Sequence, residues 1–133
     1  MDKNKEKKVA LLYDGSGAYP SGVVAWEQVL QARGYDVVKA SGQRFTDRLA
    51  VKPDLVTIPG GHSAKYNEDL GREGVTAISS YVQGGGTLLG VCGGAYFLSE
   101  DISFKMLERD GSVTLKDKKG IGLIAARSFN VAV

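Results

Sequence analysis

The only cysteine of this chain lies in the stretch Gly84-Gly85-Gly86-Thr87-Leu88-Leu89-Gly90-Val91-Cys92-Gly93-Gly94-Ala95-Tyr96. The apolar residues before the cysteine predict a short strand, and the residues after it open a helix, so we expect Cys92 on a sharp turn. In the G-x-S-x-G elbow of hydrolases, glycines flank the nucleophile because neighbouring segments pass too close for a Cβ. Gly90-Val91-Cys92-Gly93-Gly94 has this form with sulfur in place of oxygen. It predicts a thiol nucleophile; the alternative is a small buried apolar residue.

Composition predicts one globular domain over residues 1–133, with residues 1–7 as a flexible lead-in. The chain has 133 residues, of which 43% are hydrophobic and 24% charged, a profile that excludes disordered and fibrous proteins. Several of its basic residues lie in the lead-in, which could serve as a nucleic-acid arm. No basic stripe with interleaved aromatic residues follows, so we predict no nucleic-acid partner.

The numbers of cysteines and histidines indicate in which compartment the protein works and whether it binds a metal or cofactor. A single cysteine forms no internal disulfide, and no apolar run near the start has the length of a signal peptide or a membrane span. We therefore expect a cytoplasmic protein with no membrane partner. With one histidine and one cysteine the sequence predicts no metal site, and we expect no cofactor.

Strands alternate with helices along the first hundred residues. Four short apolar runs are expected as strands: Val9–Tyr13, Tyr35–Lys39, Asp54–Ile58 and Thr87–Val91. Three intervening segments are expected as helices: Ser21–Arg33, a short helix within Ser41–Lys52, and Arg72–Gln83. This alternation predicts an α/β fold with a mostly parallel central sheet and helices on both of its faces.

The first helix is expected to be capped by Ser21 and to end at Gly34, a glycine suited to a left-handed stop. Its apolar face is expected to comprise Ala25, Trp26, Val29 and Leu30. The short second helix has Phe45 and Leu49 one turn apart, and Gly84 is expected to end the third helix.

The pattern changes after Ile102. Two apolar segments flank the turn signal Asp110-Gly111, which predicts an antiparallel hairpin. Ile121–Ala126 and Phe129–Val133 are expected to add one or two further strands.

Three polar or glycine-rich segments follow predicted strand ends. They are Asp14, Gly60-Gly61-His62 and Cys92. Because parallel α/β sheets bind ligands beyond the carboxyl ends of their strands, these segments are expected to share one rim.

Several motifs in this order resemble the class I glutamine amidotransferase-like superfamily, and within it the biotin–protein ligase N-terminal-like domains. The resemblance spans roughly residues 8 to 104. The residues that carry it are Leu11-Leu12-Tyr13-Asp14-Gly15-Ser16-Gly17, Ile58-Pro59-Gly60-Gly61, Tyr66 to Gly74, and Gly85 to Phe97.

The resemblance implies a flavodoxin-like three-layer sandwich in which Cys92 is the elbow nucleophile. It further implies an oxyanion hole formed by backbone N–H groups near Gly61 and Gly93. Two preorganised donors of this kind are among the largest contributions to acyl-transfer catalysis, on the order of 3 kcal/mol each.

The chain departs from the family pattern at two places. Glutamine-hydrolysing members have Cys-x-Gly-x-Gln, whereas Tyr96 stands at the glutamine position here. Those members also use a later histidine followed by glutamate, and no histidine follows Cys92. Specificity for glutamine and the usual triad are therefore not expected.

His62 is the only imidazole that could act as the general base for Cys92. The alternative is a loop histidine that is exposed or bonded to its own turn. Asp14, Tyr13, Tyr66 and Tyr96 are candidate substrate contacts. Alternatively, Asp14 closes its own Asp-Gly turn, and the tyrosines cover the edges of the core.

Domains of this superfamily continue well past the hairpin, and the apolar segment Phe129–Val133 would leave an exposed edge if it were unpaired. Either a second copy or another chain completes the sheet, with a homo-oligomer preferred, or this is a shortened form of the domain.

Three functions are compatible with the sequence. The first is a cysteine-dependent hydrolase or amidotransferase-like enzyme that acts on an amide of a small-molecule substrate. The second is a non-catalytic module that binds a small ligand or a partner and retains the elbow. The third is a redox-sensing thiol.

Overall fold

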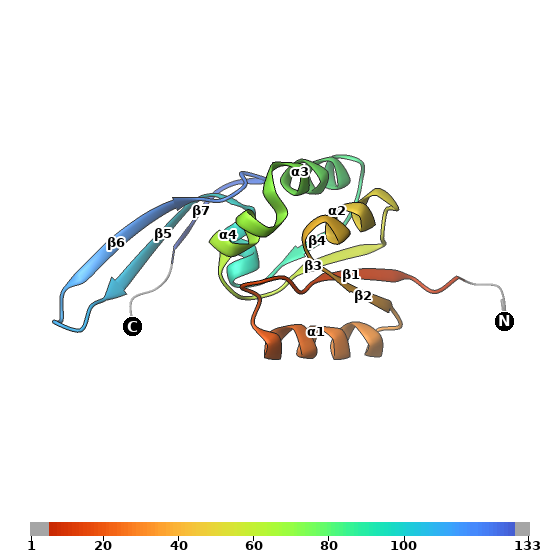
Figure 1. The fold of residues 1–133 in the computed structure, drawn as a ribbon, viewed down its shortest axis with the longest axis horizontal. Helices are drawn as coiled ribbons and strands as arrows, with labels where there is room; N and C mark the ends of the chain where they lie inside the picture. Colours follow the sequence, from red (N-terminus) through yellow and green to blue (C-terminus); the bar gives the residue numbers. More distant parts are fainter. Residues whose placement is uncertain (1–5, 130–133) are drawn as a thin grey trace.

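The computed structural model describes residues 6–129, which form a four-stranded sheet and a three-stranded sheet (Figure 1). The strands of the first sheet are β1 (Val9–Tyr13), β2 (Asp36–Ala40), β3 (Leu55–Ile58) and β4 (Leu88–Gly90). They lie in the order β2-β1-β3-β4, and all three pairings are parallel. This order is that of flavodoxin-like folds, so the predicted α/β class is confirmed.

Helices cover both faces of the parallel sheet, which confirms the three-layer arrangement (Figure 1). One face carries α1 (Pro20–Ala32), and the other carries α2 (Gly42–Ala50) and α3 (Ser63–Gln83). The main core lies between the sheet and the second pair of helices. The short helix predicted within Ser41–Lys52 is present as α2, and its Phe45 and Leu49 are buried there.

The start of α1 differs from the prediction. Pro20 is the first helical residue and Tyr19 holds the cap position without a side-chain hydrogen bond, so the prediction that Ser21 caps this helix is wrong. Proline suits this position because its fixed φ is already helical and its missing N–H has no intrahelical partner there. The helix stops as expected before Gly34, whose φ of 89° lies in the left-handed region.

The buried face of α1 also differs. Val23 and Leu30 are buried, whereas Val29 is 49% exposed and Ala25 is exposed. The helix packs mainly against β1 and β2. The prediction is therefore right for Leu30, which is buried, and for Trp26, which is half-buried. It is wrong for Ala25 and Val29.

Helix α3 is longer than expected because it joins two helical segments. Gly71, with φ 62° and ψ −172°, breaks the helical backbone between them. The sequence predicted only the second segment, and it missed the first, which buries Tyr66 and Leu70. At the far end α3 stops before Gly84, but the left-handed residue is Gly85, with φ 96°.

The last elements form the second sheet. After the short helix α4 (Gly93–Leu98) come three strands, β5 (Ser99–Leu107), β6 (Val113–Lys119) and β7 (Ile124–Phe129), in the order β6-β5-β7. The antiparallel pairing of β5 and β6 confirms the predicted hairpin, which projects away from the parallel sheet (Figure 1).

Some expectations fall partly outside the described residues. Most of the lead-in predicted for residues 1–7 lies there, and so does most of the strand predicted for Phe129–Val133. Within residues 6–129, no helix is long and apolar enough to cross a membrane.

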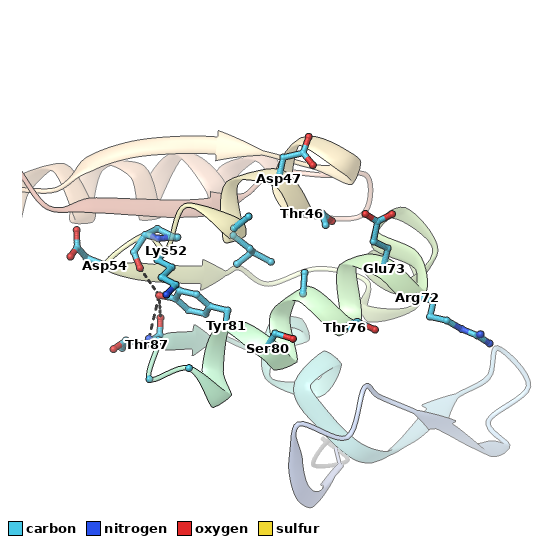
Figure 2. A pocket seen from close by; sticks show the side chains of 17 residues that line it. Thr46, Asp47, Lys52, Asp54, Arg72, Glu73, Thr76, Ser80, Tyr81 and Thr87 are labelled. Carbon is cyan, nitrogen blue, oxygen red and sulfur yellow. Dashed lines mark hydrogen bonds between the residues drawn. The ribbon is translucent and has the colours of Figure 1, made fainter.

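Tyr81 ties the second half of α3 to the starts of β3 and β4. Its hydroxyl donates to the Pro53 carbonyl oxygen at 2.7 Å and accepts from the Thr87 N–H at 3.2 Å (Figure 2). We expect Tyr81→Phe to lower the free energy of unfolding by about 1–3 kcal/mol, because both partners lose their bond. Urea denaturation measures this. The control Tyr35→Phe should change it by less than about 0.5 kcal/mol; equal losses in both variants would contradict the argument.

Candidate active site

Cys92 lies on the turn between β4 and α4. Its backbone has φ 53° and ψ −114°, a conformation that residues with a Cβ rarely adopt. Such strain costs on the order of 1–3 kcal/mol and is concentrated at functional sites. The Cys92 side chain is exposed rather than packed among aliphatic groups. The turn therefore presents the thiol to solvent in the strand–turn–helix context of a nucleophile elbow.

Glycines allow two backbone segments to touch beneath this turn. A Cβ on Gly93 would overlap the carbonyl oxygen of Gly61 and would lie 2.8 Å from the Gly61 nitrogen. A Cβ on Gly94 would overlap the Ile58 oxygen and lie 3.0 Å from that of Pro59. The loop after β3 thus packs backbone to backbone against the start of α4, which only glycine permits.

A β-bridge orients the Gly61 peptide group. Ala18 and Gly61 form an isolated antiparallel bridge, in which Tyr19 N–H donates to Gly60 and His62 N–H donates to Gly17. In this type of pair the N–H of Gly61 itself points away from Ala18, toward the side on which Gly93 lies. Within residues 6–129, neither the Gly61 nor the Gly93 N–H donates to a backbone acceptor.

His62 lies on the same rim but is not bonded to the thiol. It occupies the cap position of α3 and is exposed, and its ring meets the Tyr19 ring edge to face at 5.5 Å between centroids. In the described part of the chain, no hydrogen bond joins the imidazole to the Cys92 sulfur. A role for His62 as general base stays a prediction.

Asp14 is the first residue after β1, and it is exposed. Its backbone N–H donates to the Ala40 carbonyl at the end of β2. A substrate contact by Asp14 also stays a prediction.

The three tyrosines occupy different environments. Tyr13 and Tyr66 are fully buried, and their hydroxyls donate to Asp69 at 2.7 Å and to the Pro59 oxygen at 2.9 Å. Burial and the bond to Asp69 raise the pKa of Tyr13. These two side chains offer no surface to a ligand in this structure. Tyr96 is half-buried, with its ring edge to face on Phe104 at 4.9 Å.

Tyr66 supports the Gly60-Gly61 loop from below. Its hydroxyl holds the Pro59 carbonyl and lies where a Cβ on Gly61 would be. Burial, with smaller contributions from the Tyr19 and Cys92 groups, raises the pKa of Tyr66 to about 12.

Tyr19 belongs to the rim, although the sequence analysis did not select it. The residue is 49% exposed, and its N–H is bonded to Gly60. The signal that could have identified it is its place at the end of the loop that follows β1.

A second residue that was missed is Asp69. Its carboxylate accepts hydrogen bonds from the Tyr13 hydroxyl and the Gly42 N–H, so it has a structural role.

A cavity of about 1040 Å³ lies elsewhere, between α2 and α3 near the starts of β3 and β4 (Figure 2). Its rim carries charges of both signs, from Asp47, Lys52, Asp54, Arg72 and Glu73. It shares no residue with the Cys92 rim, because it opens at the amino ends of the strands. Within residues 6–129, no group of three or more His, Cys, Asp or Glu side chains could hold a metal ion.

The close backbone contact at Gly93 predicts a large effect of one methyl group. Gly93→Ala should lower the free energy of unfolding by about 2 kcal/mol or more, because the Cβ would displace the Gly61 backbone. The matched control is Gly22→Ala in α1, where a Cβ would meet only Tyr19 at 4.0 Å. That change should stabilise the protein by about 0.5–1 kcal/mol. Urea denaturation measures the free energy of unfolding of both variants. An unchanged value in Gly93→Ala would refute the close contact between Gly93 and Gly61.

The pKa of Tyr66 predicts a dependence of stability on alkaline pH. Its folded pKa of about 12 exceeds its ordinary value of 10.0, so between these values only the unfolded chain releases the proton. This stability is complete below pH 10.0 and is lost as the pH rises toward 12. Tyr66→Phe should therefore reduce the slope of stability against pH in this window by up to about 1.4 kcal/mol per pH unit. Denaturation at several pH values measures the slopes, which would be equal if Tyr66 did not titrate in this way.

Comparison with known proteins gives three findings. A sequence profile of the family described as "Biotin-protein ligase, N terminal" matches residues 8–120. An uncharacterized protein of Chlamydia muridarum (strain MoPn / Nigg) is 43% identical over 68 residues, covering 51% of this chain and 25% of that protein. A biotin–protein ligase of Schizosaccharomyces pombe (strain 972 / ATCC 24843) is 29% identical over 115 residues, covering 81% of this chain and 18% of the ligase.

A solved structure shares the fold. The crystal structure of a putative peptidase E protein from Listeria monocytogenes EGD-e aligns with a TM-score of 0.65 and 17% sequence identity. The alignment covers 92% of this chain and 66% of that one. The likeness shows a class I glutamine amidotransferase-like, flavodoxin-like fold. The chain spans a quarter or less of the two curated relatives.

Proposed function

Since this chain belongs to the family of biotin–protein ligase N-terminal domains and has the class I glutamine amidotransferase-like fold, we propose that it is a cysteine-dependent enzyme acting on an amide or a related carbonyl. The observation that carries the proposal is the exposed thiol of Cys92, held at φ 53° between β4 and α4. The Gly61 and Gly93 amides beside it support the proposal further.

In the proposed reaction, the Cys92 sulfur bonds to the carbonyl carbon while the thiol proton passes to the imidazole of His62. The carbonyl oxygen takes up the displaced electron pair and accepts hydrogen bonds from the N–H groups of Gly61 and Gly93. The C–N bond then breaks, and the amine leaves with the proton from His62. Water hydrolyses the resulting thioester and regenerates the thiol.

Tyr96 argues for a substrate other than glutamine. It stands where glutamine-hydrolysing members carry the glutamine of Cys-x-Gly-x-Gln, and its ring packs on Phe104 instead of offering an amide. We therefore propose a small amide that is recognised without that contact.

An activated ester tests the nucleophile. With p-nitrophenyl acetate, Cys92 should displace p-nitrophenolate in a burst equal to the protein concentration, and mass spectrometry should find one acetyl group on Cys92. Cys92→Ala should abolish the burst and the adduct, and Cys92→Ser should reduce both. An unmodified Cys92, with release no faster than in Cys92→Ala, would exclude the enzyme.

The same assay tests the proposed base. His62→Gln should slow acylation by about 10²–10⁴-fold, the usual contribution of a positioned general base. The exposed Lys65→Gln in the same helix is the matched control and should keep the wild-type rate. An unchanged rate in His62→Gln would remove His62 from the mechanism and leave the role of Cys92 intact.

One observation favours a second candidate, a binding module that retains the elbow. In residues 6–129, no imidazole or carboxylate is hydrogen-bonded to the Cys92 sulfur. A binding module would keep its ligand affinity after Cys92→Ala, and no acyl adduct would form on the wild-type protein.

We also propose that the chain works in the cytoplasm as a homo-oligomer. An exposed free thiol such as Cys92 persists in a reducing compartment. In the described structure, β4 pairs only with β3 and is an edge of the parallel sheet, which a second chain could extend.

A further inference from the structure

We propose that the space bounded by Gly60, the Tyr19 ring and the Cys92 sulfur is the subsite for the group attached to the scissile amide, and that Tyr19 selects an aromatic group there. This inference rests on the proposed function, because the subsite adjoins the carbonyl that Cys92 would attack. It names the residue that determines specificity and the class of substrate.

Gly60 defines this space. A Cβ on Gly60 would lie 3.5 Å from the Cys92 Cβ, 4.0 Å from the Cys92 sulfur and 3.9 Å from Cδ2 of Tyr19. One position beside the Gly60 backbone is thus in ordinary van der Waals contact with both the thiol and the ring. A substrate group attached to the scissile amide would occupy this position.

Gly60 differs from the glycines around it. A Cβ on Gly61, Gly93 or Gly94 would overlap a neighbouring backbone or hydroxyl oxygen, so packing requires glycine at those positions. At Gly60 no such overlap occurs, and its φ lies outside the left-handed region. Neither packing nor conformation requires glycine there. Its missing side chain leaves room for at least a methyl-sized group next to the thiol.

Two aromatic rings stand beside this space. The Tyr19 backbone is held next to Gly60 by its N–H bond to the Gly60 carbonyl and by the Ala18–Gly61 bridge, and Cδ2 of its ring lies 3.9 Å from the Cβ position of Gly60. The His62 ring packs edge to face against it, so two rings from the loops after β1 and β3 stand together on the rim. The raised pKa of Tyr66 agrees with this placement, since Tyr19 and Cys92 both contribute to it.

An aromatic substrate group fits this environment better than an aliphatic one. Aromatic rings gain edge-to-face or offset contacts with another ring beyond the area that they bury. Contact with the Tyr19 ring should favour an aromatic over an aliphatic group by about threefold to tenfold.

Alkylation of Cys92 tests the subsite without requiring turnover. In each reaction the sulfur bonds to the reagent's methylene carbon, iodide leaves and the thiol proton passes to buffer. The reagents are iodoacetamide, N-benzyl iodoacetamide and N-cyclohexylmethyl iodoacetamide, each referred to its rate with glutathione. The wild-type protein should prefer the benzyl reagent over both others by about threefold to tenfold.

Variants locate the source of the preference. Tyr19→Phe should keep it, and Tyr19→Ala should remove it. Gly60→Ala should also remove it, because the methyl group fills the space without a clash. Val51→Ala is the control, since Val51 is 73% exposed in the α2–β3 connection and should keep the preference. Circular dichroism verifies that each variant is folded.

Three results would overturn the inference: equal relative rates for the three reagents, an equal preference for the cyclohexylmethyl reagent, or a preference that survives both Tyr19→Ala and Gly60→Ala. Its failure is distinguishable from that of the proposed function. If the protein prefers the aromatic reagent but forms no acetyl adduct in the ester assay, the subsite proposal stands and the proposed enzymatic function is wrong. If the adduct forms but the preference is absent, the proposed function stands and the subsite proposal is wrong.

Discussion

The contact between the backbone of the Gly60-Gly61 loop and the Gly93-Gly94 turn is the constraint on which the candidate site depends. It brings the end of β3 against the start of α4, because no Cβ intervenes at either surface. Tyr66 fixes the loop from the core side, and the Ala18–Gly61 bridge attaches the loop after β1 to it. Three loops that follow three parallel strands thus meet at one rim, with the strained Cys92 among them.

The sequence predicted the layers of this fold because parallel strands covered on both faces are continuous apolar runs. Val9–Tyr13 agrees with the structure at both ends, and the other three strands agree within a residue or two. The errors are in the helices, where a short periodic pattern does not determine which stripe will face the sheet. Helix α1 packs mainly against two strands, and its buried stripe is narrower than its apolar pattern. The first half of α3 was missed because Gly71 interrupts the pattern, and a glycine gives no sign of whether the chain ends a helix or continues it at an angle.

Some features of the candidate site could be predicted from the sequence, and others could not. The position of Cys92 at a strand end followed from its neighbours, since strand, turn and helix are all local features. The environments of Tyr13 and Tyr66 could not be predicted in this way. Both rings lie in the core, and their hydroxyls bond to Asp69 and Pro59, contacts that are made only in the folded chain. Tyr19 was missed for a similar reason. Its position at the end of the loop after β1 is a local signal, but its place beside Gly60 results from a bridge between two loops distant in sequence.

The candidate site consists of backbone features that position the nucleophile and of side chains that would meet the substrate. The turn at Cys92 and the amides of Gly61 and Gly93, which have no backbone acceptor within residues 6–129, are backbone features. They are held by packing that only glycine allows and by the Tyr66 hydroxyl below the loop. The groups that would move protons or hold a substrate are side chains on the rim, such as His62 and Tyr19, and they are attached to exposed loops. Tyr96 can therefore replace the glutamine of the family motif, with its ring against Phe104, without disturbing the elbow. A site built in this way keeps its nucleophile geometry while its specificity changes, because the strain at Cys92 is balanced by the backbone contact below it and not by the residues that would meet the substrate.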